Sequence, residues 1–271
     1  MPSIYRVTLS LVLFWMFGAM IIGCSLAHQM VFQPTQLEEE TKIGEWFKAE
    51  ELKIKTVDSL EISAAFIPKE NSKNLIVYFH GNGGSLKGWI WEYEWFKKLI
   101  SNFLMIDYRG YGKSQGVPSE EGLYLDAFSA IEYAKTKGFK PENTVVVGRS
   151  IGSSIAMKVA TKYKVKQVIL ITPFPDFDYF VNREYWFLLP WLYNPFDFEN
   201  CVMAKETSQK TLILTAQLDQ AIPAKYGRKL KDCFSQKVEY YELEGVGHNN
   251  ISANPLYGTY LHYSIQEILE K

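Results

Sequence analysis

A serine between glycines stands where the sequence pattern changes from strand to helix. Ser150 is the centre of the pentapeptide Gly-Arg-Ser-Ile-Gly at residues 148–152, directly after the apolar run 144–147 and before a helical pattern. A strand-to-helix turn of this kind is so tight that it needs both glycines, and it exposes the serine hydroxyl at the edge of a sheet. The pentapeptide therefore predicts a nucleophilic serine. The structural alternative is a helix start rich in small residues.

A serine nucleophile needs a base and an acid that orients the base, and both types of residue follow in the chain. Asp219 comes after the apolar run 211–216, and His248 comes after the strand-like segment 238–243. The order Ser, Asp, His is the one found with such a serine elbow. We predict Ser150 as nucleophile, Asp219 as the orienting acid and His248 as the general base.

Acyl transfer by a serine also needs N–H donors aimed at the oxygen on which negative charge develops. The buried-strand pattern of residues 74–79 ends in His80 and a glycine-rich loop whose amides are unshielded. We predict an oxyanion hole made by the backbone amides of Ile151 and Asn82, with Gly83 as the alternative to Asn82. His80 itself is expected to brace this loop and to take no part in proton transfer.

Together these motifs resemble the α/β-hydrolase superfamily of serine hydrolases, and within it the branch of membrane-associated abhydrolase-domain proteins. The resemblance rests on the histidine–glycine loop, the block Asp-Tyr-Arg-Gly-Tyr-Gly-Lys-Ser at residues 107–114, the serine elbow, Asp219 and His248. It extends roughly from residue 52 to the C-terminus. One departure is Ala216, where many relatives carry glycine before the acid.

The resemblance implies an α/β fold of the α/β-hydrolase type, with a mostly parallel central sheet, helices on both faces and a small aromatic cap insertion. It also implies a serine hydrolase that acts on ester bonds without a cofactor. The block at residues 108–110 corresponds to the family's loop after the fourth strand, and we expect a structural role for it. Arg149 is expected to be a structural cation packed beneath the elbow, and recognition of a substrate carboxylate or phosphate is the alternative.

The strand and helix patterns agree with that fold. Segments 52–57 and 60–67 alternate in polarity and predict an antiparallel hairpin at the sheet edge. Parallel strands are predicted at residues 75–79, 103–106, 144–147, 168–171, 212–214 and 238–241, separated by helices at 91–101, 119–137, 151–163, 223–233 and 256–269. This alternation favours a parallel sheet that is covered on both faces and binds ligands at the carboxyl ends of its strands. Ser150, Asp219 and His248 all fall at those ends.

An aromatic insertion at about residues 173–206 interrupts this alternation. Either it is a small helical subdomain that covers the sheet, or it is a cap over the serine. As a cap it would line an apolar slot for an acyl chain, or dip into lipid. The residues expected in the slot are Trp186, Leu188, Leu189 and Trp191, with Trp89, Trp91 and Trp95 as the opposite wall.

Composition sets the broad class of the protein. The chain has 271 residues, 47% of them hydrophobic, which suits one large α/β domain. Lysine and arginine number 29 against 30 acidic residues, so the charge balance favours no nucleic-acid partner. Neither the cysteines nor the histidines have the spacing of a metal site, and no metal is predicted.

The N-terminus predicts a targeting or anchoring segment. Arg6 precedes an uncharged apolar run at residues 7–23, which is shorter than the roughly 20 residues of a membrane helix and better fits the core of a signal peptide. The sequence Ile-Ile-Gly-Cys at residues 21–24 resembles a bacterial lipobox, which predicts lipidation of Cys24 and a lipoprotein of the bacterial cell envelope. The alternatives are an uncleaved N-terminal single-pass anchor and a buried helix.

We therefore divide the chain into a signal peptide or anchor (1–23), a polar tether (24–50) and an α/β-hydrolase domain (51–271). Cys201 and Cys233 remain in the domain. In an exported protein they could form a disulfide, and two buried free thiols are the alternative.

The function expected from these observations is that of a membrane-tethered serine hydrolase that cleaves an acyl ester or thioester. Carboxylesterases, lysophospholipases and acyl-thioesterases are the types that fit. The expected partners are a small-molecule or lipid acyl substrate and, through the N-terminus, a membrane surface. The alternatives are a serine peptidase of the same fold and a noncatalytic lipoprotein that binds a hydrophobic ligand or a protein.

Overall fold

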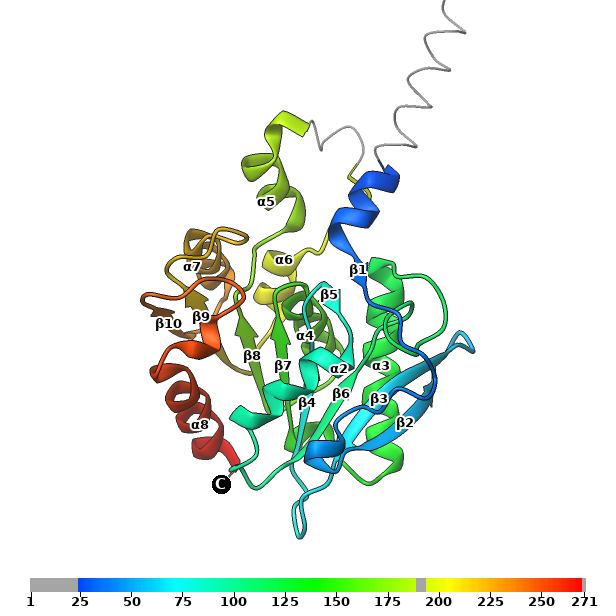
Figure 1. Cartoon of the computed structure of the whole chain (residues 1–271). Coiled ribbons are helices and arrows are strands. Elements are labelled where there is room, and N and C mark those ends of the chain that lie inside the picture. Colours follow the sequence, from blue (N-terminus) through cyan, green and yellow to red (C-terminus); the bar gives the residue numbers. More distant parts are fainter. Residues whose placement is uncertain (1–23, 189–193, 270–271) are drawn as a thin grey trace, which may run out of the picture.

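An eight-stranded, mostly parallel sheet forms the centre of the protein (Figure 1). The computed structural model describes residues 24–188 and 194–269. The strands, in their order across the sheet, are β10 (Glu239–Leu243), β9 (Lys210–Ala216), β8 (Gln167–Ile171), β7 (Thr144–Arg149), β4 (Leu75–Phe79), β6 (Asn102–Ile106), β3 (Glu61–Ile67) and β2 (Glu50–Lys55). Only the β2–β3 and β3–β6 pairs of this sheet are antiparallel. The predicted parallel sheet and its edge hairpin are confirmed.

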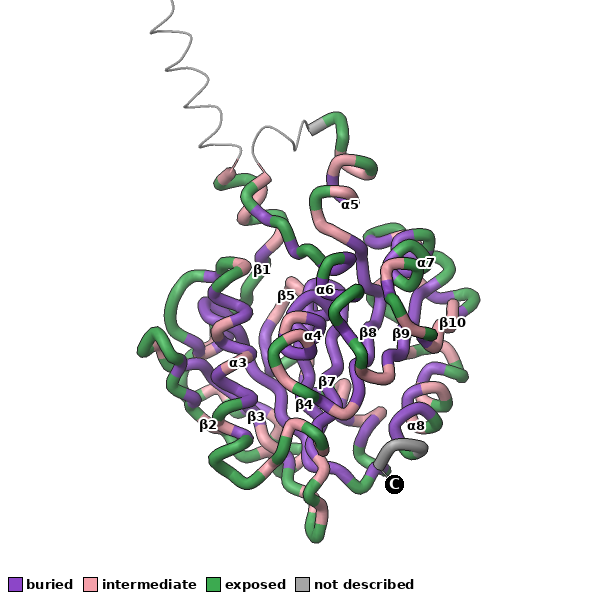
Figure 2. The backbone as a smooth tube through the Cα atoms, turned by 180° about the vertical axis from the view of Figure 1, so that it is seen from behind, coloured by how far each residue is buried: buried purple, intermediate pink, exposed green. Residues whose placement is uncertain are grey.

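Helices cover both faces of the sheet because its central strands are apolar on both sides. In β4, Leu75, Val77 and Phe79 belong to one core, and Ile76 and Tyr78 belong to the other. The first core also includes side chains of α3 (Glu120–Thr136), α4 (Ile151–Lys162), α6 (Asn200–Glu206) and α7 (Ala224–Cys233), and the second includes those of α2 (Leu86–Trp89) and α8 (Leu256–Leu269). The central strands and the inner faces of these helices are buried, whereas the edge strands β2 and β10 are largely exposed or half-buried (Figure 2).

The helix predicted at residues 91–101 is wrong in type and extent. The segment instead continues from α2 into a 3₁₀ helix, η2 (Ile90–Trp95), followed by turns. The buried apolar side chains of this stretch recur at every third position: Ile90, Tyr93, Phe96 and Leu99. A spacing of three matches the three residues per turn of a 3₁₀ helix, which places Ile90 and Tyr93 on one side of η2, and the turns after it continue the same spacing with Phe96 and Leu99.

The segment predicted as a tether packs against the domain. Residues 24–31 are helical, and the two-residue strand β1 (Gln33–Pro34) pairs in parallel with β5 (Gly83–Gly84) in the glycine-rich loop. Phe32 and Ile43 are buried, each in one of the two cores. Residues 32–43 are therefore part of the folded body.

The apolar run 7–23, together with its predicted signal peptide or anchor, lies outside the described residues. Among the helices that the structure describes, none combines the length and the apolar character needed to cross a bilayer.

The aromatic insertion stands above the carboxyl ends of the parallel strands, next to the N-terminal helix (Figure 1). It contains α5 (Phe177–Glu184), the short 3₁₀ helix η4 (Trp186–Leu188) and α6. A disulfide between Cys201 and Cys233, whose Cα atoms are 5.1 Å apart, joins α6 to α7. Of the two alternatives for these cysteines, the structure contains the bonded one.

Candidate active site

Ser150 occupies a strained turn between β7 and α4. Its backbone has φ 55° and ψ −122°, in a region that non-glycine residues rarely adopt. A side chain at Gly148 would overlap the backbone of Gly152, and one at Gly152 would overlap the carbonyl oxygen of Phe79. The two glycines therefore let β7, α4 and β4 approach closely enough to form the turn, as the pentapeptide predicts.

The loops after β9 and β10 bring Asp219 and His248 together. The Nδ1 atom of His248 lies 2.7 Å from Oδ2 of Asp219. The other oxygen of Asp219 accepts hydrogen bonds from the amides of Ala221 (2.9 Å) and Ile222 (2.7 Å), which hold the carboxylate in place. Because an ionised carboxylate only accepts hydrogen bonds, Nδ1 carries the proton and Nε2 of the neutral ring is left as an acceptor.

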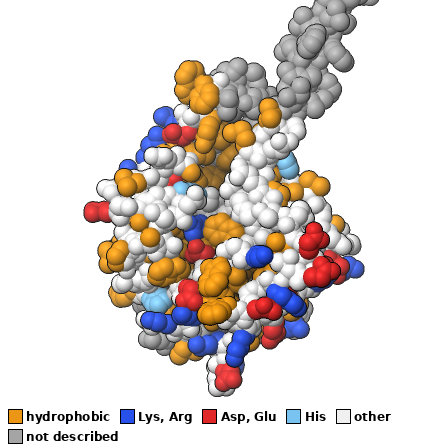
Figure 3. Space-filling model, in the orientation of Figure 1, with side chains coloured by type: hydrophobic (Ala, Val, Ile, Leu, Met, Phe, Trp, Pro, Cys, Tyr) orange, Lys and Arg blue, Asp and Glu red, His pale blue; other side chains and the backbone are white. Residues whose placement is uncertain are grey.

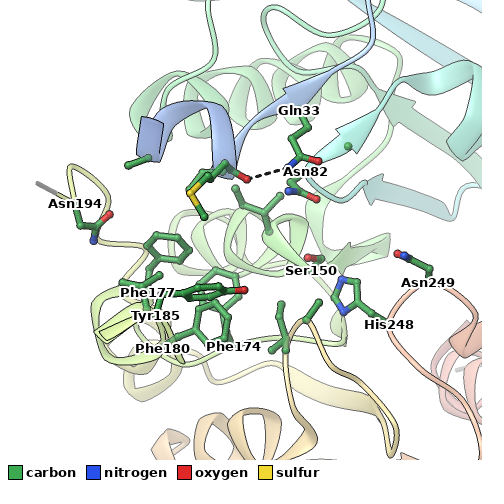
Figure 4. A pocket seen from close by; sticks show the side chains of 18 of the residues that line it. Gln33, Asn82, Ser150, Phe174, Phe177, Phe180, Tyr185, Asn194, His248 and Asn249 are labelled. Atoms are coloured by element: carbon green, nitrogen blue, oxygen red, sulfur yellow. Dashed lines mark hydrogen bonds between the residues drawn. The ribbon is translucent and has the colours of Figure 1, made fainter. Parts of the chain in front are cut away.

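The ring of His248 lies beside the side chain of Ser150 at the edge of a pocket (Figure 4). In the part of the chain that the structure describes, no hydrogen bond links the Ser150 hydroxyl to this ring. Catalytic hydrogen bonds of this kind often tighten only when a substrate binds. The arrangement places a hydroxyl, an imidazole and a carboxylate in the order that nucleophilic catalysis requires.

Arg149 connects the serine elbow to the histidine loop. Its Nη2 donates hydrogen bonds to the carbonyl oxygens of His248 (2.9 Å) and Asn249 (3.2 Å), and its Nη1 pairs with Glu92 at 2.5 Å. Burial alone would lower the pKa of Arg149, but Tyr78 and Glu92 outweigh it, so the pKa lies above its usual value. Arg149 is the buried structural cation that was expected, and its contact with the His248 loop is one that the sequence did not predict.

His80 braces the glycine-rich loop, as expected. Its Nδ1 lies 2.7 Å from the carbonyl oxygen of Gly81, and the ring is completely buried. That carbonyl belongs to the same rigid amide plane as the Asn82 N–H, so the contact orients this donor. On its other side the ring faces Asp107 at 3.3 Å, where burial raises the pKa of the carboxyl group while His80 acts against the rise.

The predicted oxyanion donors lie at the pocket. Ile151, Asn82 and Gly83 all line it together with Ser150. Neither the Ile151 amide nor the Asn82 amide donates a hydrogen bond to another described residue. The carbonyl oxygen of Asn82, in contrast, accepts from the Gln33 amide (3.0 Å) and the Tyr111 hydroxyl (2.8 Å). Both predicted amides are therefore available to a ligand.

The pocket has a volume of about 550 Å³ and a largely apolar lining. Hydrophobic side chains surround a hollow at the upper end of the molecule (Figure 3). Its described lining residues are Ala27, Met30, Val31, Gln33, Asn82, Gly83, Trp89, Ser150, Ile151, Phe174, Phe177, Phe180, Val181, Tyr185, Asn194, Ala221, Ile222, His248 and Asn249. Lysine, arginine, aspartate and glutamate are absent from this set.

The walls of the pocket differ in part from those predicted. Trp89 lines it, but Trp91 and Trp95 do not, because Trp91 packs on Phe47 and Trp95 packs on Tyr257. The insertion contributes Phe174, Phe177, Phe180 and Tyr185. Trp186 is not among the lining residues and is 63% exposed. Leu189, Trp191 and the side chain of Leu188 lie outside the described part of the chain. The opposite wall is formed by the helix at residues 24–31, which was expected to be a tether.

No group of three or more histidine, cysteine, aspartate or glutamate side chains that could hold a metal ion occurs among the described residues.

A mostly parallel eight-stranded sheet that carries a serine on a strand-to-helix elbow defines an α/β hydrolase, and the chain belongs to the α/β-hydrolase family. The profile of the Alpha/beta hydrolase family matches residues 76–200. Human alpha/beta hydrolase domain-containing protein 17B is 31% identical over 201 residues, which cover 70% of this chain. The match covers 65% of that relative, which is less than two thirds of its length.

Solved structures show the same fold. The esterase Pf2001 of Pyrococcus furiosus superposes with a TM-score of 0.69 at 17% identity, over 88% of this chain and 100% of the esterase. An alpha-beta hydrolase from Vibrio vulnificus superposes with a TM-score of 0.67 at 23% identity, over 83% of this chain and 87% of that protein. Likenesses at these identities establish the fold and leave the substrate to the site itself.

Proposed function

We propose that this α/β hydrolase is a serine hydrolase that cleaves an acyl ester or thioester at a membrane surface. The observation that carries the proposal is the 2.7 Å contact between His248 and Asp219, beside a strained Ser150 on the wall of an apolar pocket. Such a pocket suits an acyl group, and the three side chains suit a nucleophilic mechanism.

The proposed reaction has two steps. In the first, Nε2 of His248 takes the hydroxyl proton of Ser150 while the serine oxygen attacks the acyl carbonyl carbon. The bond to the leaving alcohol or thiol then breaks, and His248 donates the proton to that leaving group. In the second step, His248 takes a proton from water, whose oxygen attacks the carbonyl carbon of the acyl-enzyme. The ester bond to Ser150 then breaks, and His248 donates that proton to the serine oxygen, which releases the carboxylic acid and restores the free serine and the neutral imidazole. Asp219 stabilises the imidazolium ion in both steps.

In this mechanism the amides of Ile151 and Asn82 donate hydrogen bonds to the oxyanion, with Gly83 as the alternative second donor. Loss of one such donor typically costs about 3 to 4 kcal/mol of transition-state stabilisation. Two observations support this assignment. The amides of Ile151 and Asn82 donate to no other described residue, and the contact of His80 with the Gly81 carbonyl orients the Asn82 amide.

The membrane part of the proposal rests on the sequence. The apolar run 7–23 and the lipobox-like residues before Cys24 support a lipid-anchored protein of the bacterial cell envelope, with an N-terminal single-pass anchor as the alternative. The mass of the mature N-terminus separates the two, since a diacylglyceryl Cys24 and an intact Met1 differ greatly in mass.

Labelling of the full-length protein with a fluorophosphonate probe tests the catalytic serine. We expect Ser150→Ala to abolish labelling, and Ser154→Ala to retain it, because Ser154 is a buried serine on α4, the helix that begins directly after Ser150, and does not line the pocket. We also expect His248→Ala to reduce p-nitrophenyl ester turnover by at least about 10³-fold, because the serine loses its base.

Labelling that survives Ser150→Ala would remove Ser150 from the mechanism. Turnover near the parent level in His248→Ala would exclude this histidine as the base. A folded parent protein that is neither labelled nor active on esters or thioesters would favour the noncatalytic, ligand-binding alternative. A series of matched acyl esters and thioesters then identifies the preferred bond.

A further inference from the structure

The helix at residues 24–31 lies across the pocket from the aromatic insertion (Figure 4). Ala27, Met30 and Val31 line the pocket on this side, and Phe177 lines it on the other. The spacing of three and four residues places the three N-terminal side chains on one face of the helix. Leu26, on the same helix, does not line the pocket and is 54% exposed.

Two contacts fix the helix to the domain, one from His28 within it and one from Phe32 directly after it. Nε2 of His28 lies 2.7 Å from the carbonyl oxygen of Pro118. Phe32, which follows the helix, is buried and packs edge-on against Phe196 of the insertion at 5.2 Å between ring centres. The pocket therefore has a docked wall on this side.

Strand β1, which follows the helix, forms hydrogen bonds with the oxyanion loop, the glycine-rich loop after β4 that carries the predicted oxyanion donors Asn82 and Gly83. The Gln33 amide donates to the carbonyl oxygen of Asn82 (3.0 Å), and the Thr35 amide donates to that of Gly84 (2.9 Å). Because a peptide bond is planar, the bond to the Asn82 carbonyl also orients the N–H of Gly83. Two of the predicted oxyanion residues thus depend on β1 for their position.

From these contacts we infer that the segment at residues 24–35 is a working part of the active site. Its helix forms one wall of a binding site for a long acyl chain, and β1 positions the oxyanion loop. The inference rests on the proposed function and extends it to the substrate class and to the residues that select it. In the sequence this segment directly follows the apolar run 7–23, so the chain predicted to anchor the protein continues into the wall of its active site.

An acyl chain is the occupant that this site fits. The pocket is continuous with Ser150, and none of its described lining residues carries a carboxylate, ammonium or guanidinium group that would bind a charged headgroup. Burial of each added methylene in such a pocket is expected to raise kcat/KM by about fourfold until the pocket is filled.

The wall is tested on the full-length protein by its chain-length selectivity, measured as the ratio of kcat/KM for p-nitrophenyl dodecanoate to that for p-nitrophenyl acetate. We expect Met30→Trp and Val31→Trp each to lower this ratio at least tenfold, because the indole fills the slot. Leu26→Trp adds the same group to the same helix outside the pocket, and we expect it to leave the ratio within twofold of the parent.

An unchanged ratio in both lining variants would overturn the assignment of this wall, and so would an equal fall in Leu26→Trp. Failure of the proposed function looks different, because the parent itself would then show no Ser150-dependent turnover of either ester.

The role of β1 is tested by comparing Gln33→Pro with Gln33→Ala. Both variants lose the carboxamide group of Gln33, but only proline also removes the backbone N–H that donates to the Asn82 carbonyl oxygen. We expect kcat for the acetate ester to be at least tenfold lower in Gln33→Pro than in Gln33→Ala, with KM changed less than threefold, because an oxyanion donor acts mainly in the transition state.

Equal kcat values in two folded variants would overturn this role. If Gln33→Pro does not fold, as judged by its thermal transition, Thr35→Pro and Thr35→Ala provide the same comparison at the Gly84 carbonyl.

Discussion

At the level of single residues, Arg149 connects the serine elbow to the loop that carries His248. It precedes Ser150 in the chain, and its guanidinium group donates to the carbonyl oxygens of His248 and Asn249. Glu92, at 2.5 Å, balances its charge, and both side chains are largely buried. Removal of one member of a buried pair leaves an uncompensated charge, so a test of its role in catalysis must keep the positive charge.

We expect Arg149→Lys to lower kcat by about 10- to 100-fold, with KM changed less than threefold. The ammonium group still pairs with Glu92 but lacks the fork that contacts the two carbonyls, and small displacements of a catalytic group cost rates of this order. Steady-state kinetics on a p-nitrophenyl ester measure the effect.

Arg228→Lys is the matched control, because Arg228 forms an exposed ion pair with Glu242 away from the pocket. A folded Arg149→Lys protein with kcat within twofold of the parent would show that other contacts hold the His248 loop.

At the level of secondary-structure elements, the site depends on how closely β4, β7 and α4 approach one another. α4 approaches the end of β4 at Gly152, where any side chain would overlap the carbonyl oxygens of Phe79 and His80. The backbone of β4 cannot yield, because it is paired on both sides in the middle of the sheet. The glycine is therefore required by packing as well as by the turn.

We expect Gly152→Ala to lower the free energy of unfolding by about 3 kcal/mol or more, because it overpacks a rigid part of the core. Urea denaturation measures this change. Gly88→Ala is the control, because a Cβ at Gly88 meets no neighbouring atom, and alanine there is expected to be neutral or to stabilise by up to about 1 kcal/mol. A decrease of less than 1 kcal/mol in the free energy of unfolding for Gly152→Ala would contradict this, because it would mean that β4 and α4 can move apart to accommodate the methyl group.

The disulfide between Cys201 and Cys233 acts at the same level. It connects α6, at the end of the aromatic insertion, to α7, which follows the Asp219 loop. Closing a loop with a sequence separation of 32 residues reduces the entropy of the unfolded chain by the equivalent of about 4 kcal/mol. The bond thus holds the insertion to the part of the domain that carries Asp219.

Across the whole molecule, Arg109 joins the edge hairpin to the helical layer. Its guanidinium group pairs with Asp58, in the turn between β2 and β3, at 2.8 Å, and with Asp126 of α3, also at 2.8 Å. The hydrogen bonds from Arg109 and Thr56 lower the pKa of Asp58 to about 2. The loop after β6 is therefore structural, in agreement with the sequence analysis.

The pH dependence of stability follows from this shift. The pKa of Asp58 is lower in the folded state than its ordinary value of 3.8. The ionised carboxylate therefore stabilises the folded state fully above pH 3.8, and this contribution to the free energy of unfolding is lost as the pH falls toward 2. We expect Asp58→Asn to destabilise the protein at pH 7 by up to about 1 kcal/mol, since the carboxylate is partly exposed to solvent. The difference from the parent should shrink between pH 4 and pH 2.

Urea denaturation across this pH range provides the measurement. Glu142→Gln is the control, because Glu142 is exposed and forms no ion pair among the described residues, so its effect should not vary with pH in this way. A difference for Asp58→Asn that stays constant from pH 7 to pH 3 would contradict the ion pair as its source.

The sequence by itself determined the features that depend on neighbours along the chain. Apolar runs and their spacing predicted the parallel sheet, the edge hairpin and most helices, and the two glycines around Ser150 predicted the elbow. Asp219 and His248 could be named because each follows a strand, and the carboxyl ends of parallel strands share one edge of a sheet.

Tertiary structure alone decided which distant segments meet. The helix at residues 24–31 became a wall of the pocket through contacts such as those of His28 with Pro118 and Phe196, which lie far along the chain and which the sequence of the helix does not indicate. Arg149 reaches a carbonyl 99 residues further along the chain. The physical reason is that periodicity and glycine spacing encode local backbone geometry, whereas such contacts form only when the whole core has packed.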